Sequence, residues 1–121
     1  MIITICGSTR FKKEIEAVAH DLTLQDHIVL TPCVFHHADE EELSVETKIR
    51  LDNLHKQKIN MSDAIFVVNK DGYIGESTFG EIDWANRMKK EIFFLVEPPK
   101  PEGTENTPTE NDETSPATKE D

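Results

Sequence analysis

The residues best suited to chemistry lie in the stretch Ser62–Ala85, where a short apolar run leads through a glycine-containing loop into a helical pattern. Two carboxylates, Glu76 and Glu81, lie near the start of that pattern, and a carboxylate can act there as a nucleophile or as a general acid or base. Glu81 and Asp83 are about 200° apart around a helix, so at most one of them can face a pocket. We expect Glu81 to lie in the first helical turn, where the helix dipole would keep it ionised. The alternative for each acid is a solvated residue or a helix cap.

A second group of candidate residues, Gly7, Ser8, Thr9 and Arg10, directly follows an apolar run. A helical pattern begins next, and the free N–H groups at the start of a helix bind anions. The two hydroxyls and the guanidinium would add hydrogen bonds to a phosphate or to a sugar. The segment lacks the glycines and the lysine of a Walker A or dinucleotide-binding motif. An ordinary tight turn remains the alternative interpretation.

The histidines suggest an acid or base rather than a metal centre. His36 and His37 lie close to Cys33 and Asp39, but adjacent histidines do not converge easily on one ion and no second cluster completes a site. We therefore predict no metal and no cofactor. His55 lies in a helical pattern before the central apolar run, where it could act as an acid or base near neutral pH or serve as a structural residue.

These residues must be positioned by strands and helices that alternate along the chain. The predicted strands span residues 2–6, 27–31, 64–68 and 92–96, and the predicted helices span 11–24, 45–61 and a third segment capped by Ser77 or Thr78. Such alternation demands parallel strands joined by right-handed crossovers. We predict an α/β, flavodoxin-like or Rossmann-like three-layer fold with a four-stranded parallel sheet of order 2-1-3-4. This order would place the turn at Gly7 beside the loop 69–78, and ligands bind at such a switch point.

Composition divides the chain into one small domain, residues 1–97, and a tail. From Pro98 onward the sequence has no large apolar residue and is dense in Pro, Thr, Glu and Asp. We therefore predict a disordered acidic tail over residues 98–121.

The net charge of −11 argues against non-specific binding of duplex nucleic acid, because no basic cluster is left to neutralise phosphates. Two cysteines without a secretory signal favour reduced thiols and a cytoplasmic location, and Cys6 is expected in the core. No segment approaches a membrane-spanning length, so we expect no membrane partner.

Three short motifs carry a resemblance to a known family. The strand ending in CGSTR, the strand SDAIFVVN and the segment GYIGESTFGEIDWA resemble the nucleoside 2-deoxyribosyltransferase-like family. That family includes deoxyribosyltransferases and 2'-deoxynucleoside 5'-monophosphate N-hydrolases. The likeness covers roughly Met1 to Val96.

The resemblance implies roles for particular residues. In the family, the glutamate of a Thr-x-x-Glu-Ile/Leu-x-x-Ala pattern attacks the anomeric carbon of the sugar, and Glu81 matches that glutamate in this sequence. The resemblance also implies that Tyr73 orients the nucleophile or the base. Catalytic candidates are therefore Glu81, His55 and Tyr73, and substrate-binding candidates are Gly7, Ser8, Thr9, Arg10, Asn69, Gly75, Glu76, Ser77 and Thr78.

Two positions depart from the family pattern. His55 lies where the family often carries an aspartate that assists the leaving base, and Gly75 lies where it carries aspartate or serine. Glu76, Ser77 or Thr78 could substitute for the missing side chain at Gly75.

We therefore expect a nucleoside or nucleotide N-glycosidase, or a deoxyribosyltransferase, that uses a glutamate nucleophile. The alternative is a non-catalytic nucleotide-binding or sensor module of the same fold, and a third possibility is hydrolysis of a dinucleotide. We further expect a homo-oligomer, most simply a dimer, that associates through apolar surface on residues 45–61 or beside Trp84.

Overall fold

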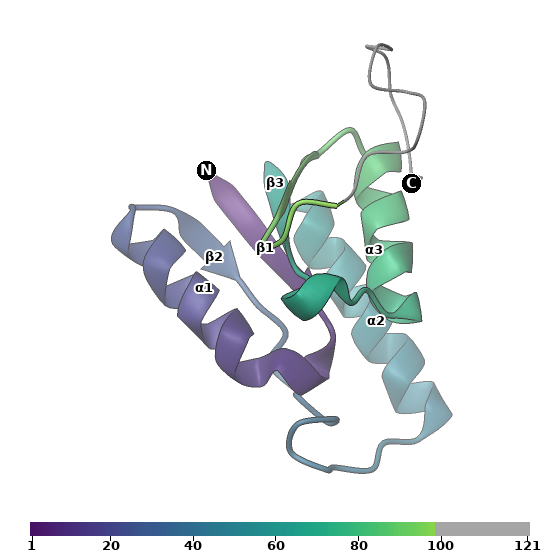
Figure 1. Cartoon of the computed structure of the whole chain (residues 1–121). Helices are drawn as coiled ribbons and strands as arrows, with labels where there is room; N and C mark the ends of the chain where they lie inside the picture. Colours follow the sequence, from purple (N-terminus) through teal and green to yellow (C-terminus); the bar gives the residue numbers. More distant parts are fainter. Residues whose placement is uncertain (99–121) are drawn as a thin grey trace, which may run out of the picture.

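The computed structural model describes residues 1–98 (Figure 1). The strands are β1 (Ile2–Gly7), β2 (Ile28–Leu30), β3 (Ala64–Val68) and β4 (Glu91–Phe94). The helices are α1 (Lys12–Leu24), α2 (Val45–Asn60) and α3 (Glu76–Arg87), with short 3₁₀ turns at Thr9–Phe11 and Lys70–Gly72. Apart from Pro98, the tail predicted over residues 98–121 lies outside the described residues.

The four strands form one parallel sheet in the order β2-β1-β3-β4, which confirms the predicted topology. β1 pairs with β3 from Ile3 opposite Ala64 to Gly7 opposite Val68. Because β1 continues to β2 on one side while β3 continues to β4 on the other, the chain leaves these two strands in opposite directions. The carboxyl ends of β1 and β3 therefore form the switch point at which open α/β sheets bind ligands.

Helices cover both faces of the sheet, α1 on one face and α2 with α3 on the other (Figure 1). Successive residues of a strand point to opposite faces. Ile5 therefore packs in the core under α1, while Cys6 packs in the core under α2 and α3. The core on the α1 face consists of Ile5, Ile15, Phe35 and Val68, and that on the other face of Cys6, Ile59, Ile65, Val67 and Ala85. The predicted three layers are confirmed.

The start of α3 differs from the prediction. Gly75, in an extended conformation, is the N-cap, and its carbonyl accepts from the backbone N–H of Phe79. Ser77 and Thr78, which we expected as caps, lie inside the helix instead. Glu81 is consequently in the second turn of α3 rather than the first, one turn further from the helix terminus.

The apolar residues of α2 do not all face the sheet. The side chains of Ile49 and Leu54 are 55% and 59% exposed, whereas His55 and Ile59 are buried. A polar side chain, His55, thus shares the inward stripe of α2 with Ile59. Within residues 1–98, no helix is long and apolar enough to cross a membrane.

Replacing Gly7 by alanine should destabilise the fold, because its new Cβ would lie 2.9 Å from the carbonyl oxygen of Val68 on β3. We expect Gly7→Ala to lower the free energy of unfolding by roughly 1–3 kcal/mol in urea titrations, as overpacking does elsewhere. Gly80→Ala is the matched control. Gly80 lies in α3, and a Cβ added there would have no neighbouring atom within 4 Å. The substitution should therefore be neutral or stabilising by up to about 1 kcal/mol, because alanine favours helix more than glycine does. Equal stabilities of the two variants would contradict the close contact of β1 with β3.

Candidate functional site

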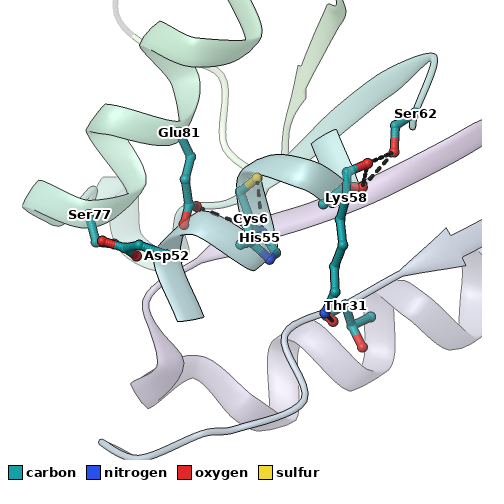
Figure 2. A network of polar contacts seen from close by, with 9 residues as sticks. Cys6, Thr31, Asp52, His55, Lys58, Ser62, Ser77 and Glu81 are labelled. Carbon is teal, nitrogen blue, oxygen red and sulfur yellow. Dashed lines mark hydrogen bonds and ion pairs between the residues drawn. The ribbon is translucent and has the colours of Figure 1, made fainter. Parts of the chain in front are cut away.

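Three side chains from three different elements meet beneath α2 and α3: Cys6 from β1, His55 from α2 and Glu81 from α3 (Figure 2). The Cys6 Sγ lies 3.6 Å from the His55 Nε2, which in turn lies 4.0 Å from the Glu81 Oε1. Cys6, His55 and Glu81 are buried, with exposed fractions of 0%, 7% and 9%. The structure therefore brings the two acid–base candidates from the sequence, Glu81 and His55, into one buried cluster. It adds a thiol that the sequence analysis had taken only as core.

Local sequence explains why these side chains point inward. In α3 the buried residues Thr78, Glu81 and Ala85 recur at intervals of three and four, which is the spacing of one helical stripe. In α2, His55 and Ile59 share a stripe in the same way. Glu81 and His55 therefore occupy positions that a purely structural helix would fill with apolar side chains. A buried carboxyl at such a position is costly, and this cost points to a functional role.

Burial dominates the electrostatics of the cluster. Desolvation, with a smaller contribution from the carboxylate of Asp52, raises the pKa of Glu81 to about 8. Desolvation, together with the charge of Lys58, lowers the pKa of His55 to about 4, and burial raises the pKa of Cys6 well above its ordinary value. At neutral pH the three groups are thus uncharged, and the 4.0 Å contact of His55 with Glu81 is not an ion pair. The expectation that the helix dipole keeps Glu81 ionised was wrong, because loss of hydration outweighs the dipole one turn into the helix.

Asp52 is a member of the site that the sequence analysis missed. Its Oδ1 accepts a hydrogen bond of 3.0 Å from the Ser77 hydroxyl (Figure 2), and its negative charge raises the pKa of both His55 and Glu81. Asp52 is exposed, so it lies at the solvent side of the cluster. Its place one turn before His55 on α2 was the available signal, because residues three apart share a helix face.

A second part of the site lies where the turn after β1 meets the loop after β3. The Arg10 guanidinium lies 5.0 Å from the centre of the Tyr73 ring, and its Nε donates to the Ser8 hydroxyl at 3.1 Å. A Cβ at Gly75 would lie 3.3 Å from the Tyr73 Oη. The turn and the loop are thus neighbours, as the strand order predicted.

Two backbone N–H groups in and after the turn that follows β1 are directed at Ser8. The N–H of Arg10 is directed at the Ser8 hydroxyl at 3.3 Å, and the N–H of Phe11 donates to the Ser8 carbonyl at 2.9 Å. The expected anion site made of free N–H groups is therefore partly closed by Ser8. The Arg10 guanidinium remains exposed at the surface, and the Thr9 hydroxyl accepts from the N–H of His37 at 3.4 Å.

The loop that carries the other histidines packs over this turn. Besides the contact of His37 with Thr9, the Lys12 Nζ lies 3.2 Å from Asp39, and Phe35 is buried in the core under α1. Cys33 lines a groove of about 570 Å³ between α1 and residues 31–35. These loop residues lie on the α1 side of the sheet, whereas the cluster around Glu81 lies under α2 and α3.

The remaining predicted ligand residues have different surroundings. Asn69 is buried, and its amide exchanges two hydrogen bonds with the backbone of Val96, at 2.8 and 2.9 Å. It therefore holds the loop to the chain after β4. Glu76 is exposed in the first turn of α3, and Thr78 is buried one turn before Glu81.

One group of side chains has the types and spacing to hold a metal ion among the described residues. It is Cys6, His55 and Glu81, whose ligand atoms all lie within 4.8 Å of one another. The loop cluster that the sequence analysis considered, with His36 and His37, is not brought together in this way.

Comparisons with known proteins support the fold. No family model and no curated protein matches the chain. Among the solved structures, the chain is similar to the CMP N-glycosidase BcmB of Clostridium botulinum, with 20% sequence identity and a TM-score of 0.54. The match covers 78% of this chain and 70% of the other. At this identity the likeness shows a shared fold.

The unusual pKa of Glu81 should make stability depend on pH. The unfolded carboxyl ionises near 4.5 and the folded one near 8, so unfolding releases a proton between these values and stability falls as pH rises. His55 acts in the opposite direction only below 6.5, its ordinary pKa. Between pH 6.5 and 8, we therefore expect the free energy of unfolding to fall by about 2 kcal/mol.

Urea titrations across this range would measure the fall. Glu81→Gln, which mimics the protonated carboxyl, should abolish it, while Glu76→Gln, at an exposed acid in the same helix, should keep it. Parallel pH curves for wild type and Glu81→Gln would show that Glu81 ionises normally in the folded protein.

Proposed function

We propose that this protein is a nucleotide N-glycosidase in which Glu81 is the nucleophile. The observation that carries the proposal is the buried Glu81 beside His55, close to the carboxyl ends of β1 and β3 where this fold binds ligands. Two further findings support it: the fold is similar to that of a CMP N-glycosidase, and Thr78, Glu81, Ile82 and Ala85 match the nucleophile motif of the nucleoside 2-deoxyribosyltransferase-like family.

The first step uses the one proton that Glu81 and His55 hold between them. In the substrate complex, the 4.0 Å distance between the His55 Nε2 and the Glu81 Oε1 shortens to a hydrogen bond. Glu81 then passes its proton to His55. The Glu81 carboxylate attacks the anomeric carbon while the bond from that carbon to the base nitrogen breaks. The base leaves with the bonding electrons and takes the proton from His55. The products are a glycosyl ester on Glu81, neutral His55 and free base.

The second step regenerates the enzyme. A water molecule attacks the anomeric carbon of the ester, and His55 accepts a proton from that water. The bond from the sugar to Glu81 breaks, and the carboxylate that leaves recovers the proton from His55. Sugar with a free anomeric hydroxyl is released, as in retaining glycosidases. A second base in place of water would make the same site a transferase.

Recognition of the rest of the substrate falls to the exposed part of the site. Arg10 carries a positive charge at the switch point of a chain whose net charge is −11, so it is suited to a 5'-phosphate or a sugar hydroxyl. The Tyr73 ring beside it offers an aromatic face to the base. Asp52 and Ser77, which are hydrogen-bonded at the solvent side of Glu81, can bind sugar hydroxyls.

The decisive test is chromatographic detection of free base after incubation with nucleosides and their 5'-monophosphates, in ribo and deoxy forms. Each reaction runs with and without an acceptor base. Glu81→Gln should lower base release by at least about a thousandfold, the scale of loss when a catalytic group that acts in the transition state is removed. Asp83→Asn, which removes an exposed carboxylate about 200° around the same helix from Glu81, should retain most of the activity.

The outcomes separate the candidate functions. A new nucleoside that forms only with acceptor would indicate transfer rather than hydrolysis. No base release from any substrate, combined with nucleotide-dependent thermal stabilisation of the wild type, would contradict catalysis and favour a nucleotide-binding module.

The predicted homodimer can be tested on the exposed apolar face beside the site. Val45 and Ile49, four residues apart on one side of α2, are 71% and 55% exposed. Ile49 precedes Asp52 by one turn, and Asp52 contacts Ser77 at the start of α3, so this face adjoins the Glu81 cluster. We expect the wild type to sediment as a dimer at micromolar concentration and Ile49→Glu to sediment as a monomer.

Leu54→Glu is the matched control. Leu54 is 59% exposed on the same helix but lies about 140° around the helix axis from Ile49. The Leu54→Glu substitution should therefore leave the dimer intact. A monomeric wild type would contradict the prediction, and a dimer unaffected by Ile49→Glu would place the interface elsewhere.

A further inference from the structure

We propose that Cys6, His55 and Glu81 form a binding site for a divalent, thiol-preferring cation of the zinc class, and that this cation inhibits the protein by occupying its nucleophile. The site is distinct in chemistry from the glycosidase reaction, which uses no metal in the mechanism above. It was invisible in the sequence because its ligands come from β1, α2 and α3, one from each.

The ligand types select the metal. A thiolate sulfur, an imidazole nitrogen and a carboxylate oxygen are the three kinds of ligand that zinc takes from proteins, and three protein ligands with one open position are common for it. Magnesium and calcium prefer sets made only of oxygen, so the Cys6 sulfur disfavours them. The sulfur and the carboxylate together supply two negative charges when bound, which neutralise a divalent ion in the buried space.

The spacing fits a single ion. Zinc–ligand bonds of 2.0–2.3 Å at tetrahedral angles place neighbouring ligand atoms about 3.3–3.6 Å apart. The Cys6 Sγ and the His55 Nε2 are already 3.6 Å apart, and the His55 Nε2 and the Glu81 Oε1 are 4.0 Å apart. All three ligand atoms lie within 4.8 Å of one another, so a shift at the end of the Glu81 side chain would complete the geometry.

The surroundings also suit a bound cation. Figure 2 shows the three side chains directed toward one another, with Asp52 and Ser77 on the side of Glu81 away from Cys6. The Asp52 carboxylate adds a negative charge at the solvent side of the cluster, where an incoming cation would arrive. Glu81 keeps a slight exposure, 9%, so solvent reaches the residue that would supply the carboxylate ligand.

Binding and inhibition are separate consequences. Binding depends only on the three ligands, whereas inhibition rests on the proposed function, because a Glu81 oxygen held by the ion cannot attack a sugar. A metal-binding measurement made without substrate therefore tests the site independently of glycosidase activity.

The experiment is a titration of the full-length, reduced, metal-free protein with Co²⁺, a spectroscopic substitute for zinc. Wild type should develop a thiolate-to-cobalt charge-transfer band that saturates at one ion per chain and disappears when Zn²⁺ is added. Cys6→Ser, a nearly isosteric change, should abolish the band. Glu81→Gln should keep the charge-transfer band, because the sulfur ligand remains. It should weaken cobalt affinity at least about tenfold, because losing even a residue that only hydrogen-bonds to a metal ligand has an effect of that size.

Cys33→Ser is the matched control, because Cys33 is the other cysteine of the chain and lies in the groove beside α1. It should bind cobalt as the wild type does. A band lost in Cys33→Ser but kept in Cys6→Ser would overturn the proposal, as would no band at all in the folded wild type or unchanged affinity in Glu81→Gln. If the band behaves as expected while no substrate releases base, the metal site stands and the glycosidase proposal fails.

Discussion

The parallel pairing of β1 with β3 is the constraint on which the rest of the structure depends. It inserts the first strand between β2 and β3, so the chain departs in opposite directions from the two central strands. The pairing ends at Gly7 against Val68, where the backbones approach so closely that a side chain at Gly7 would meet the Val68 carbonyl. Through this register, Cys6 lies under α2 and α3, and Arg10 lies beside the Tyr73 loop. Both halves of the candidate site follow from one strand pair.

The second controlling factor is the low polarity around Glu81. A carboxyl in the inward stripe of α3 loses its hydration, and its pKa rises to about 8 because desolvation and the charge of Asp52 outweigh the opposing effects of Cys6 and Lys56. The neighbouring His55 loses its affinity for a proton for the same reason. Two groups whose pKa values are shifted in opposite directions can exchange one proton when a substrate changes their surroundings, which is what acid–base chemistry at one site requires. The same buried donor atoms, once deprotonated, are good ligands for a soft divalent ion.

Much of the fold was predictable because it depends on local patterns. The run of β-branched residues predicted β3 with its observed bounds, Ala64–Val68, and the alternation of strands and helices sufficed for the sheet order. Helix faces were less predictable: in α2 the exposed Ile49 and the buried His55 reverse the ordinary rule. The start of α3 at Gly75 was missed because hydroxyl side chains two residues later looked like better caps than glycine.

The sequence by itself determined the order of the elements, the parallel sheet and the edge at which the turn with Arg10 meets the loop with Tyr73, because apolar periodicity and strand alternation are local and connections obey general rules of handedness. Tertiary structure alone decided that Cys6 joins His55 and Glu81, that Asp52 lies at their solvent side, and that the Asn69 amide bonds the backbone of Val96. It also decided that Glu81 is protonated at neutral pH. Desolvation and electrostatic coupling act through space between residues far apart in the chain, and no local pattern contains those distances.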